Sequence, residues 1–203
     1  MIRSVCICVL LLIPSVALAQ PHKDRDPDWP CQQIKVPTLS LAAVWSGPAV
    51  DLDKSHWKDD QAVADLVAKV APRRVPIDHA QALIDDFAAH AGDKKQPLLL
   101  EVVAGLFTAL DTERSDVIAG LDRFGGRQKE LAAQVRADNE KLRAMQDAPA
   151  PDADAVQKMT HQVTWEVEVF QDRSRALSYA CDVPGKIEQR LFALTRQIQK
   201  QLE

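Results

Sequence analysis

Residues Thr112–Leu202 decide the fold: they read TERSDVIAGLDRFGGRQKELAAQVRADNEKLRAMQ, a short break DAPAPD over 147–152, and ADAVQKMTHQVTWEVEVFQDRSRALSYACDVPGKIEQRLFALTRQIQKQL. Apolar residues recur at the first and fourth positions of a seven-residue repeat, which places one apolar stripe on each of two helices. A break this short makes the two helices antiparallel neighbours. The sequence therefore predicts a long helical hairpin. The repeat positions are Val117, Leu121, Phe124, Gln128, Leu131, Val135, Asp138, Leu142 and Met145, then Val156, Thr160, Val163, Val167, Phe170, Ser174, Leu177 and Cys181, with Leu191, Ile198 and Leu202 further on.

Several residues mark interruptions of the hairpin. Gly125-Gly126 costs about 2 kcal/mol relative to two alanines, which predicts a kink or a close helix–helix approach. Pro184 predicts that the second arm stops near Cys181 or Asp182. Whether the first arm is continuous through Asp111–Ser115 stays open.

Charged residues of the hairpin, Glu166 among them, are expected on a solvated outer face. A few polar residues fall inside the stripes instead, where they are expected to set the register of the two helices. These are Gln128, Asp138, Thr160 and Ser174.

Residues 59–111 predict a small helical base. The first helix is expected from Asp59 to Val70, with Val63, Leu66, Val67 and Val70 on its buried face. The second opens at Asp78, with Gln81 in the position of a capping box, and ends at Gly92. The third begins at Pro97 and is apolar on nearly every side. The fold class is thus all-α, a small helical base carrying a long antiparallel hairpin.

The N-terminal region predicts secretion. Residues 1–19 have the pattern of a signal peptide, with Ala17-Leu18-Ala19 as the cleavage site, and the apolar run is too short for a membrane anchor. Residues 20–28 are polar and aperiodic and are expected to form a disordered arm. Residues 29–203 then form one helical domain. Composition favours a Gram-negative bacterium, and we expect the periplasm.

Charge excludes some partners. The 184 residues after position 19 carry 24 Lys and Arg against 29 Asp and Glu, interspersed and without a basic block. This argues against nucleic acid and against docking to anionic lipid. No membrane span is expected after signal cleavage.

Two cysteines remain after cleavage, Cys31 and Cys181. Two cysteines in an oxidising compartment predict one disulfide, here a structural one that staples the N-terminal arm to the hairpin. A redox-active pair is the alternative, but there is no Cys-x-x-Cys motif.

Three tryptophans, Trp29, Trp45 and Trp57, fall within the extended arm 29–58. Each indole removes about 150–250 Å² from water when buried, so we expect them to anchor the arm on the helices. The alternative is an aromatic platform for a ligand or partner.

No catalytic motif is present. The sequence lacks the usual nucleophile, zinc, haem and phosphate-loop signatures. Asp86 and His90 share a helix face and are interpreted as a surface pair, with a metal or acid–base site as the alternative. We expect no enzyme and no cofactor.

The opening of the arm carries one resemblance. Trp29-Pro30-Cys31, then Val36-Pro37-x-Leu39-Ser40, then Val44-Trp45-x-Gly47-Pro48 resembles the opening of uncharacterised secreted helical proteins of proteobacteria. The likeness covers about 20 residues and implies no activity.

Two functional hypotheses follow. The first is a non-catalytic scaffold that presents the hairpin to another envelope protein or to a second copy of itself. The alternative is a small-ligand or metal-binding protein with a pocket between the base helices and the Trp-rich arm.

Overall fold

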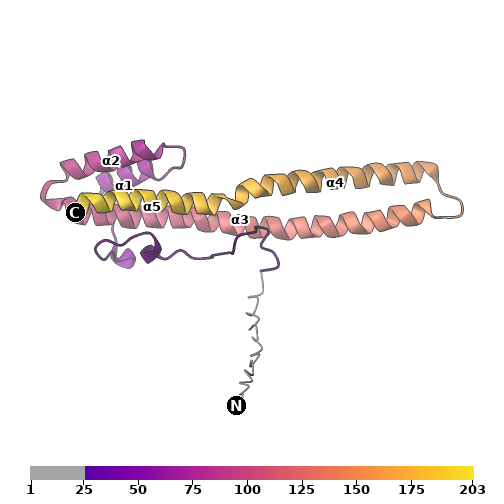
Figure 1. Ribbon diagram of the computed structural model, residues 1–203, viewed down its shortest axis with the longest axis horizontal. Helices are drawn as coiled ribbons and strands as arrows, with labels where there is room; N and C mark the ends of the chain where they lie inside the picture. The colour runs from indigo at the N-terminus through magenta and orange to yellow at the C-terminus, as the bar shows by residue number, and fades with distance from the viewer. Residues whose placement is uncertain (1–25) are drawn as a thin grey trace, which may run out of the picture.

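The computed structural model describes residues 26–203, and every regular element in that range is helical (Figure 1). The predicted signal peptide and most of the predicted disordered arm lie outside the described residues. The predicted all-α class and long hairpin are confirmed. The helices are α1 (Gln61–Val70), α2 (Ile77–His90), α3 (Lys95–Gln146), α4 (Ala153–Cys181) and α5 (Val183–Leu202), with short 3₁₀ turns η1 (Leu41–Ala43), η2 (Leu52–Lys54) and η3 (Gly92–Lys94).

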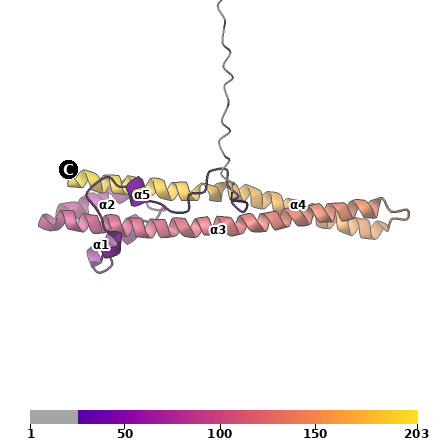
Figure 2. The ribbon, with the colours of Figure 1, turned by 90° about the horizontal axis from the view of Figure 1, so that it is seen from below.

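Helix α3 is the axis of the molecule. Its 52 residues correspond to roughly 80 Å at 1.5 Å per residue. It runs without a break through Asp111–Ser115, which answers the question that the sequence left open. Helices α4 and α5 follow one another back along it in the opposite direction (Figures 1 and 2). The change from α4 to α5 occurs at Asp182, where Pro184 predicted it.

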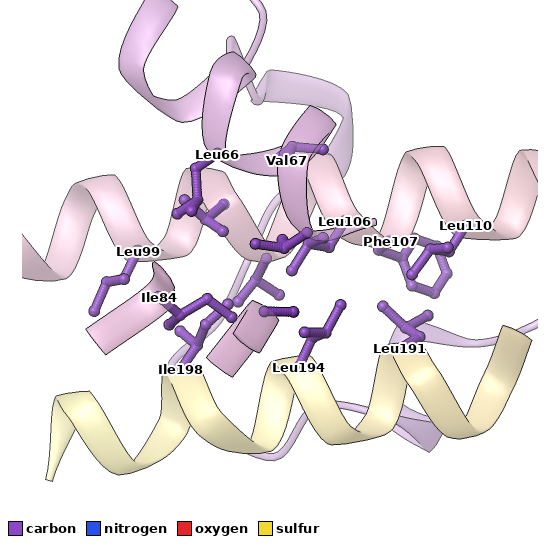
Figure 3. Close-up of a cluster of buried hydrophobic side chains, with 14 of the residues drawn as sticks. Leu66, Val67, Ile84, Leu99, Leu106, Phe107, Leu110, Leu191, Leu194 and Ile198 are labelled. Atoms are coloured by element: carbon purple, nitrogen blue, oxygen red, sulfur yellow. The ribbon is translucent and has the colours of Figure 1, made fainter. Parts of the chain in front are cut away.

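The base holds the main hydrophobic core, between α1, α2, the first half of α3 and α5 (Figure 3). Helix α1 buries the four residues that its periodicity predicted, Val63, Leu66, Val67 and Val70. Helix α5 supplies the opposite wall. Its contribution consists of Ile187, Leu191, Leu194 and Ile198, all almost fully buried.

The helix starts differ from all three predictions for the base. Helix α3 starts at Lys95, two residues before the predicted Pro97. Helix α1 starts at Gln61, because the Asp60 side chain accepts hydrogen bonds from the first-turn amides of Ala62 and Val63, at 3.0 and 3.2 Å. Helix α2 starts at Ile77 after the extended backbone of Pro76, with no side-chain cap, so the predicted capping box at Asp78 is wrong. Asp78 lies in the first turn instead, where its charge favours the positive end of the helix.

The C-terminal end of α2 agrees better with the sequence. The helix ends at His90, and Gly92 follows with φ of 54°, a left-handed conformation that favours glycine. This positive φ turns the chain into α3.

The seam of the hairpin is shifted from the predicted repeat. Thr160 is exposed, and its hydroxyl donates to the carbonyl of Val156 in its own helix. Met159 and Glu166 are buried in the seam instead, on either side of the predicted Val163. Glu166, expected on the outer face, is 4% exposed. It turns inward because the amides of Gln134 and Gln162 donate to its Oε1 at 3.1 and 3.0 Å.

Two of the other polar seam residues contact one another. The buried Gln128 donates from Nε2 to the Ser174 hydroxyl at 3.1 Å and to the Phe170 carbonyl at 3.3 Å. Because these bonds join α3 to α4 at one level, they fix the register of the two helices.

Gly125 marks a close approach, but not the predicted one between helices. A Cβ at this position would lie 2.0 Å from the Asp28 carbonyl oxygen and 3.0 Å from Cδ of Pro30. The N-terminal arm therefore crosses α3 directly over Gly125, where only glycine leaves room. Nothing lies within 4 Å of a Cβ at the neighbouring Gly126.

These adjacent glycines give a matched test. Gly126→Ala is expected to stabilise the protein by about 1 kcal/mol, because alanine favours the helix and meets no obstacle. Gly125→Ala gains the same propensity but drives the arm off the helix, and a net destabilisation of about 1–2 kcal/mol is expected. Thermal unfolding measures both changes. Equal stabilisation by the two substitutions would show that the arm does not rest on Gly125.

Candidate functional site

The disulfide joins the arm to the end of α4. Cys31 and Cys181 are bonded, with their Cα atoms 5.6 Å apart and a sequence separation of 150. This confirms the pairing predicted from the cysteine count. The bond lies in a small apolar cluster with Trp29, Ile118 and Leu121.

Side-chain hydrogen bonds reinforce this attachment. The Trp29 indole Nε1 donates to the Gln33 carbonyl at 2.7 Å, and the Gln33 amide donates to the Cys181 carbonyl. The arm is thus held to α4 by both covalent and polar contacts.

The other two tryptophans lie on the base. Trp45 is buried in the main core, and its Nε1 donates to the Pro48 carbonyl at 2.8 Å. Trp57 is half-buried above Gly105 of α3, where a Cβ would come within 3.0 Å of the indole. Trp29 belongs to a different cluster from Trp45 and Trp57. The indoles are packed along the arm at separate places, which favours the anchoring interpretation over a shared platform.

An ion-pair cluster holds the arm to α3 near the disulfide. The Lys35 ammonium lies 2.8 Å from Asp122 of α3 and 2.6 Å from Asp26 of the arm. Hydrogen bonds to Asp122 and then to Asp26 raise the pKa of Lys35. The hydrogen bond from Lys35 lowers the pKa of Asp26. Lys35 and Asp26 are therefore both charged at neutral pH.

Arg114 is the most deeply buried charged residue of the described chain, at 2% exposure. Its Nε donates to Glu188 of α5 at 2.6 Å, and its Nη2 donates to the Val36 carbonyl of the arm at 2.7 Å. One guanidinium thereby ties together α3, α5 and the arm. Its Nη1 has no hydrogen-bond partner among the described residues.

Sequence reasoning missed Arg114, although a signal was present. It lies four residues after Leu110 and seven before Leu121, on the buried face of α3. A charged residue in phase with an apolar stripe is seldom buried without a partner.

A cavity of about 460 Å³ opens beside Arg114, between the arm, α3 and the junction of α4 with α5. A second cavity of about 350 Å³ lies between the arm near Trp45 and α5. Neither cavity is lined by a residue of the base helices, 59–111. Neither is therefore the pocket that was expected between the base helices and the Trp-rich arm. The larger one is lined by Trp29, Gln33, Ile34, Val36, Arg114, Ile118, Cys181, Asp182, Pro184, Gly185, Lys186, Glu188 and Gln189.

Asp86 and His90, the candidate metal pair, line neither of the two cavities. His90 Nδ1 lies 3.5 Å from the Asp86 carboxylate and 2.7 Å from the Asp86 carbonyl, and both side chains are exposed. Residues 26–203 contain no group of three or more His, Cys, Asp or Glu side chains that could hold a metal ion. Within the same range, no helix is long and apolar enough to cross a membrane.

Comparison of the chain with protein-family models, with curated proteins and with solved structures found no match. The site is therefore interpreted from its own geometry.

Proposed function

We propose that this protein is a non-catalytic scaffold of the bacterial periplasm that presents its hairpin to a helical segment of another envelope protein. The observation that carries the proposal is Trp165, a tryptophan of α4 that is 63% exposed on the projecting part of the hairpin. An exposed indole offers a partner a large apolar contact, and tryptophan is among the residues enriched at interface hot spots.

The packing of the projecting part supports this role. Beyond the base and the arm only α3 and α4 remain side by side (Figures 1 and 2). The apolar residues that α3 contributes there are only half-buried: Leu131, Val135, Leu142 and Met145. Two helices leave one side of each apolar stripe open, and a third amphipathic helix is the partner that fits such a surface.

The proposed location rests on the sequence and the disulfide. Residues 1–19 have the signal-peptide pattern, and a disulfide between Cys31 and Cys181 fits a secreted protein in an oxidising compartment. A hairpin attached to a stapled base would hold its partner surface at a fixed distance from the base.

Site-specific photo-crosslinking in cells tests the role. A photoreactive residue in place of the exposed Glu168, one turn from Trp165, is expected to form an adduct with one recurring protein. Trp165→Ser should weaken that adduct about tenfold or more, since a hot-spot aromatic contributes about 2 kcal/mol or more. The purified partner should bind the purified protein with the same dependence on Trp165.

The matched control is on α5. Phe192 is also an exposed aromatic, at 47%. Phe192→Ser should leave the adduct formed at position 168 unchanged, and a photoreactive residue at Arg196 should not form that adduct. If the adduct forms only with a second copy of this chain, the partner of the hairpin is the protein itself and not another envelope protein. No adduct dependent on Trp165 would overturn the proposal.

A further inference from the structure

We infer that the cavity beside Arg114 binds a small organic anion, a monocarboxylate with an apolar body. This site is independent of the hairpin surface, because the cavity lies where the arm crosses the junction of α4 and α5. Three features of its wall carry the inference: an unpaired guanidinium nitrogen, an uncapped helix N-terminus, and apolar sides.

The guanidinium supplies the strongest argument. Arg114 is 98% buried, and two of its three nitrogens are bonded, Nε to Glu188 and Nη2 to the Val36 carbonyl. Nη1 lacks a partner among the described residues, and Arg114 lines the cavity. A buried cationic N–H without an acceptor is costly. Nη1 itself has less than 1 Å² of accessible surface, so an anion in the cavity would supply the missing acceptor once the atoms that cover Nη1 shift aside.

Helix α5 begins at the same cavity. Its 20 residues start at Val183, and no side chain caps the first turn, because the Asp182 carboxylate makes no bond to it. The first-turn amides of a helix lack intrahelical acceptors and lie at its positive end. Gly185 lines the cavity without a side chain to cover its backbone, and Lys186 beside it adds a positive charge that offsets the negative charge of Asp182 in the same lining.

The remaining wall defines the ligand class. Trp29, Ile34, Val36, Ile118 and Pro184 contribute apolar surface, and Ile34 is 85% exposed at the cavity. A volume of about 460 Å³ falls in the range of small-molecule sites. The Glu188 carboxylate on the other side of the guanidinium disfavours a second negative charge. A singly charged carboxylate with a short apolar chain therefore fits better than phosphate.

Two sources share this chemistry, a free carboxylic acid and the C-terminus of a peptide. Calorimetric titration of the oxidised full chain with hexanoate, and with acetyl-alanyl-leucine as the peptide mimic, distinguishes them by which acid binds more tightly. Saturable binding of at least one is expected. Hexanamide, which lacks the charge, and inorganic phosphate are each expected to bind at least tenfold more weakly.

The amide of Gly185 gives a local readout. In ¹⁵N-resolved spectra its signal is expected to shift with the acid, while that of Gly92, far along the chain in the base, stays fixed. Binding without a Gly185 shift would place the ligand elsewhere and overturn the assignment. The same conclusion follows if no acid binds saturably, or if hexanamide or phosphate binds as well as the acids.

Two substitutions with opposite expected effects test the role of the Arg114 guanidinium in binding. Arg114→Lys removes the unpaired N–H and is expected to weaken binding at least tenfold. Glu188→Gln removes the competing carboxylate and is expected to strengthen binding about threefold to tenfold, since like charges at this range repel appreciably. If Arg114→Lys does not fold, the affinity of Glu188→Gln for the acid and the shift of the Gly185 amide signal decide whether the acid binds in this cavity. A gain with Glu188→Gln without a loss in folded Arg114→Lys would show that Arg114 is merely structural. Arg196→Lys, on an exposed turn of α5, is the control and should change nothing.

Discussion

Reduction of the Cys31–Cys181 disulfide is expected to lower the thermal unfolding midpoint by about 10–20 °C. The bond closes a loop of 150 residues, and loop-closure entropy for that length corresponds to about 5 kcal/mol as an upper figure. For a domain of this size each kcal/mol moves the midpoint by about 2–4 °C. The effect is large because the loop includes α1, α2, α3 and nearly all of α4.

Calorimetry of the oxidised and the reduced protein measures this change. The double variant Cys31→Ser with Cys181→Ser should melt like the reduced wild type and should not respond to reductant. Limited proteolysis should cut the arm near Gln33 only after reduction, because the arm there is held by the disulfide and its neighbours. Equal melting of the oxidised and reduced protein would contradict the staple.

Arg190→Met is expected to destabilise the protein by about 3 kcal/mol. The guanidinium of Arg190 is buried between α5 and the end of α1. Its Nε and Nη2 donate to the Val70 carbonyl at 3.1 and 2.6 Å, and its Nη1 donates to the Val75 carbonyl at 2.8 Å. Without it, the Val70 carbonyl at the negative end of α1 and the Val75 carbonyl in the loop before α2 lose their donors, and each costs about 1–3 kcal/mol.

Burial lowers the pKa of Arg190, with Glu113 acting in the opposite direction, but an arginine stays charged at any working pH. The expected loss should therefore be independent of pH between about 5 and 9. Arg196→Met on the same helix is the control. Its guanidinium lies 6.0 Å from the Phe192 ring at the surface, and the substitution should cost about 1 kcal/mol or less. Chemical denaturation measures both variants, and equal losses would show that Arg190 does not cap α1.

The buried charged residues show most clearly what could not be predicted from the sequence. Glu166, Arg114 and Arg190 are all buried, yet the sequence predicted a solvated position for Glu166 and singled out neither arginine. Glu166 is drawn inward by Gln134 of α3, 32 residues away. Arg114 reaches Glu188, 74 residues away, and Arg190 reaches Val70, 120 residues away. Local periodicity contains no information about such distant partners.

The candidate site was predictable only in part. The count of two cysteines was enough to pair Cys31 with Cys181, because no other cysteine lies outside the predicted signal peptide. The cavity beside Arg114 was not predictable, since its walls come from the arm, α3 and the α4–α5 junction. Only the course of the arm over Gly125 brings these three segments together.

The sequence by itself determined the helices, their antiparallel order and the disulfide. These depend on residues a turn or two apart, on one short break and on the two cysteines that lie outside the predicted signal peptide. Tertiary structure decided the exact seam of the hairpin, the role of α5 as a wall of the base, and the place of the arm. These depend on which of several apolar and polar surfaces meet across long stretches of chain. That choice is made by packing and hydrogen bonding between whole helices, because many arrangements satisfy each helix alone.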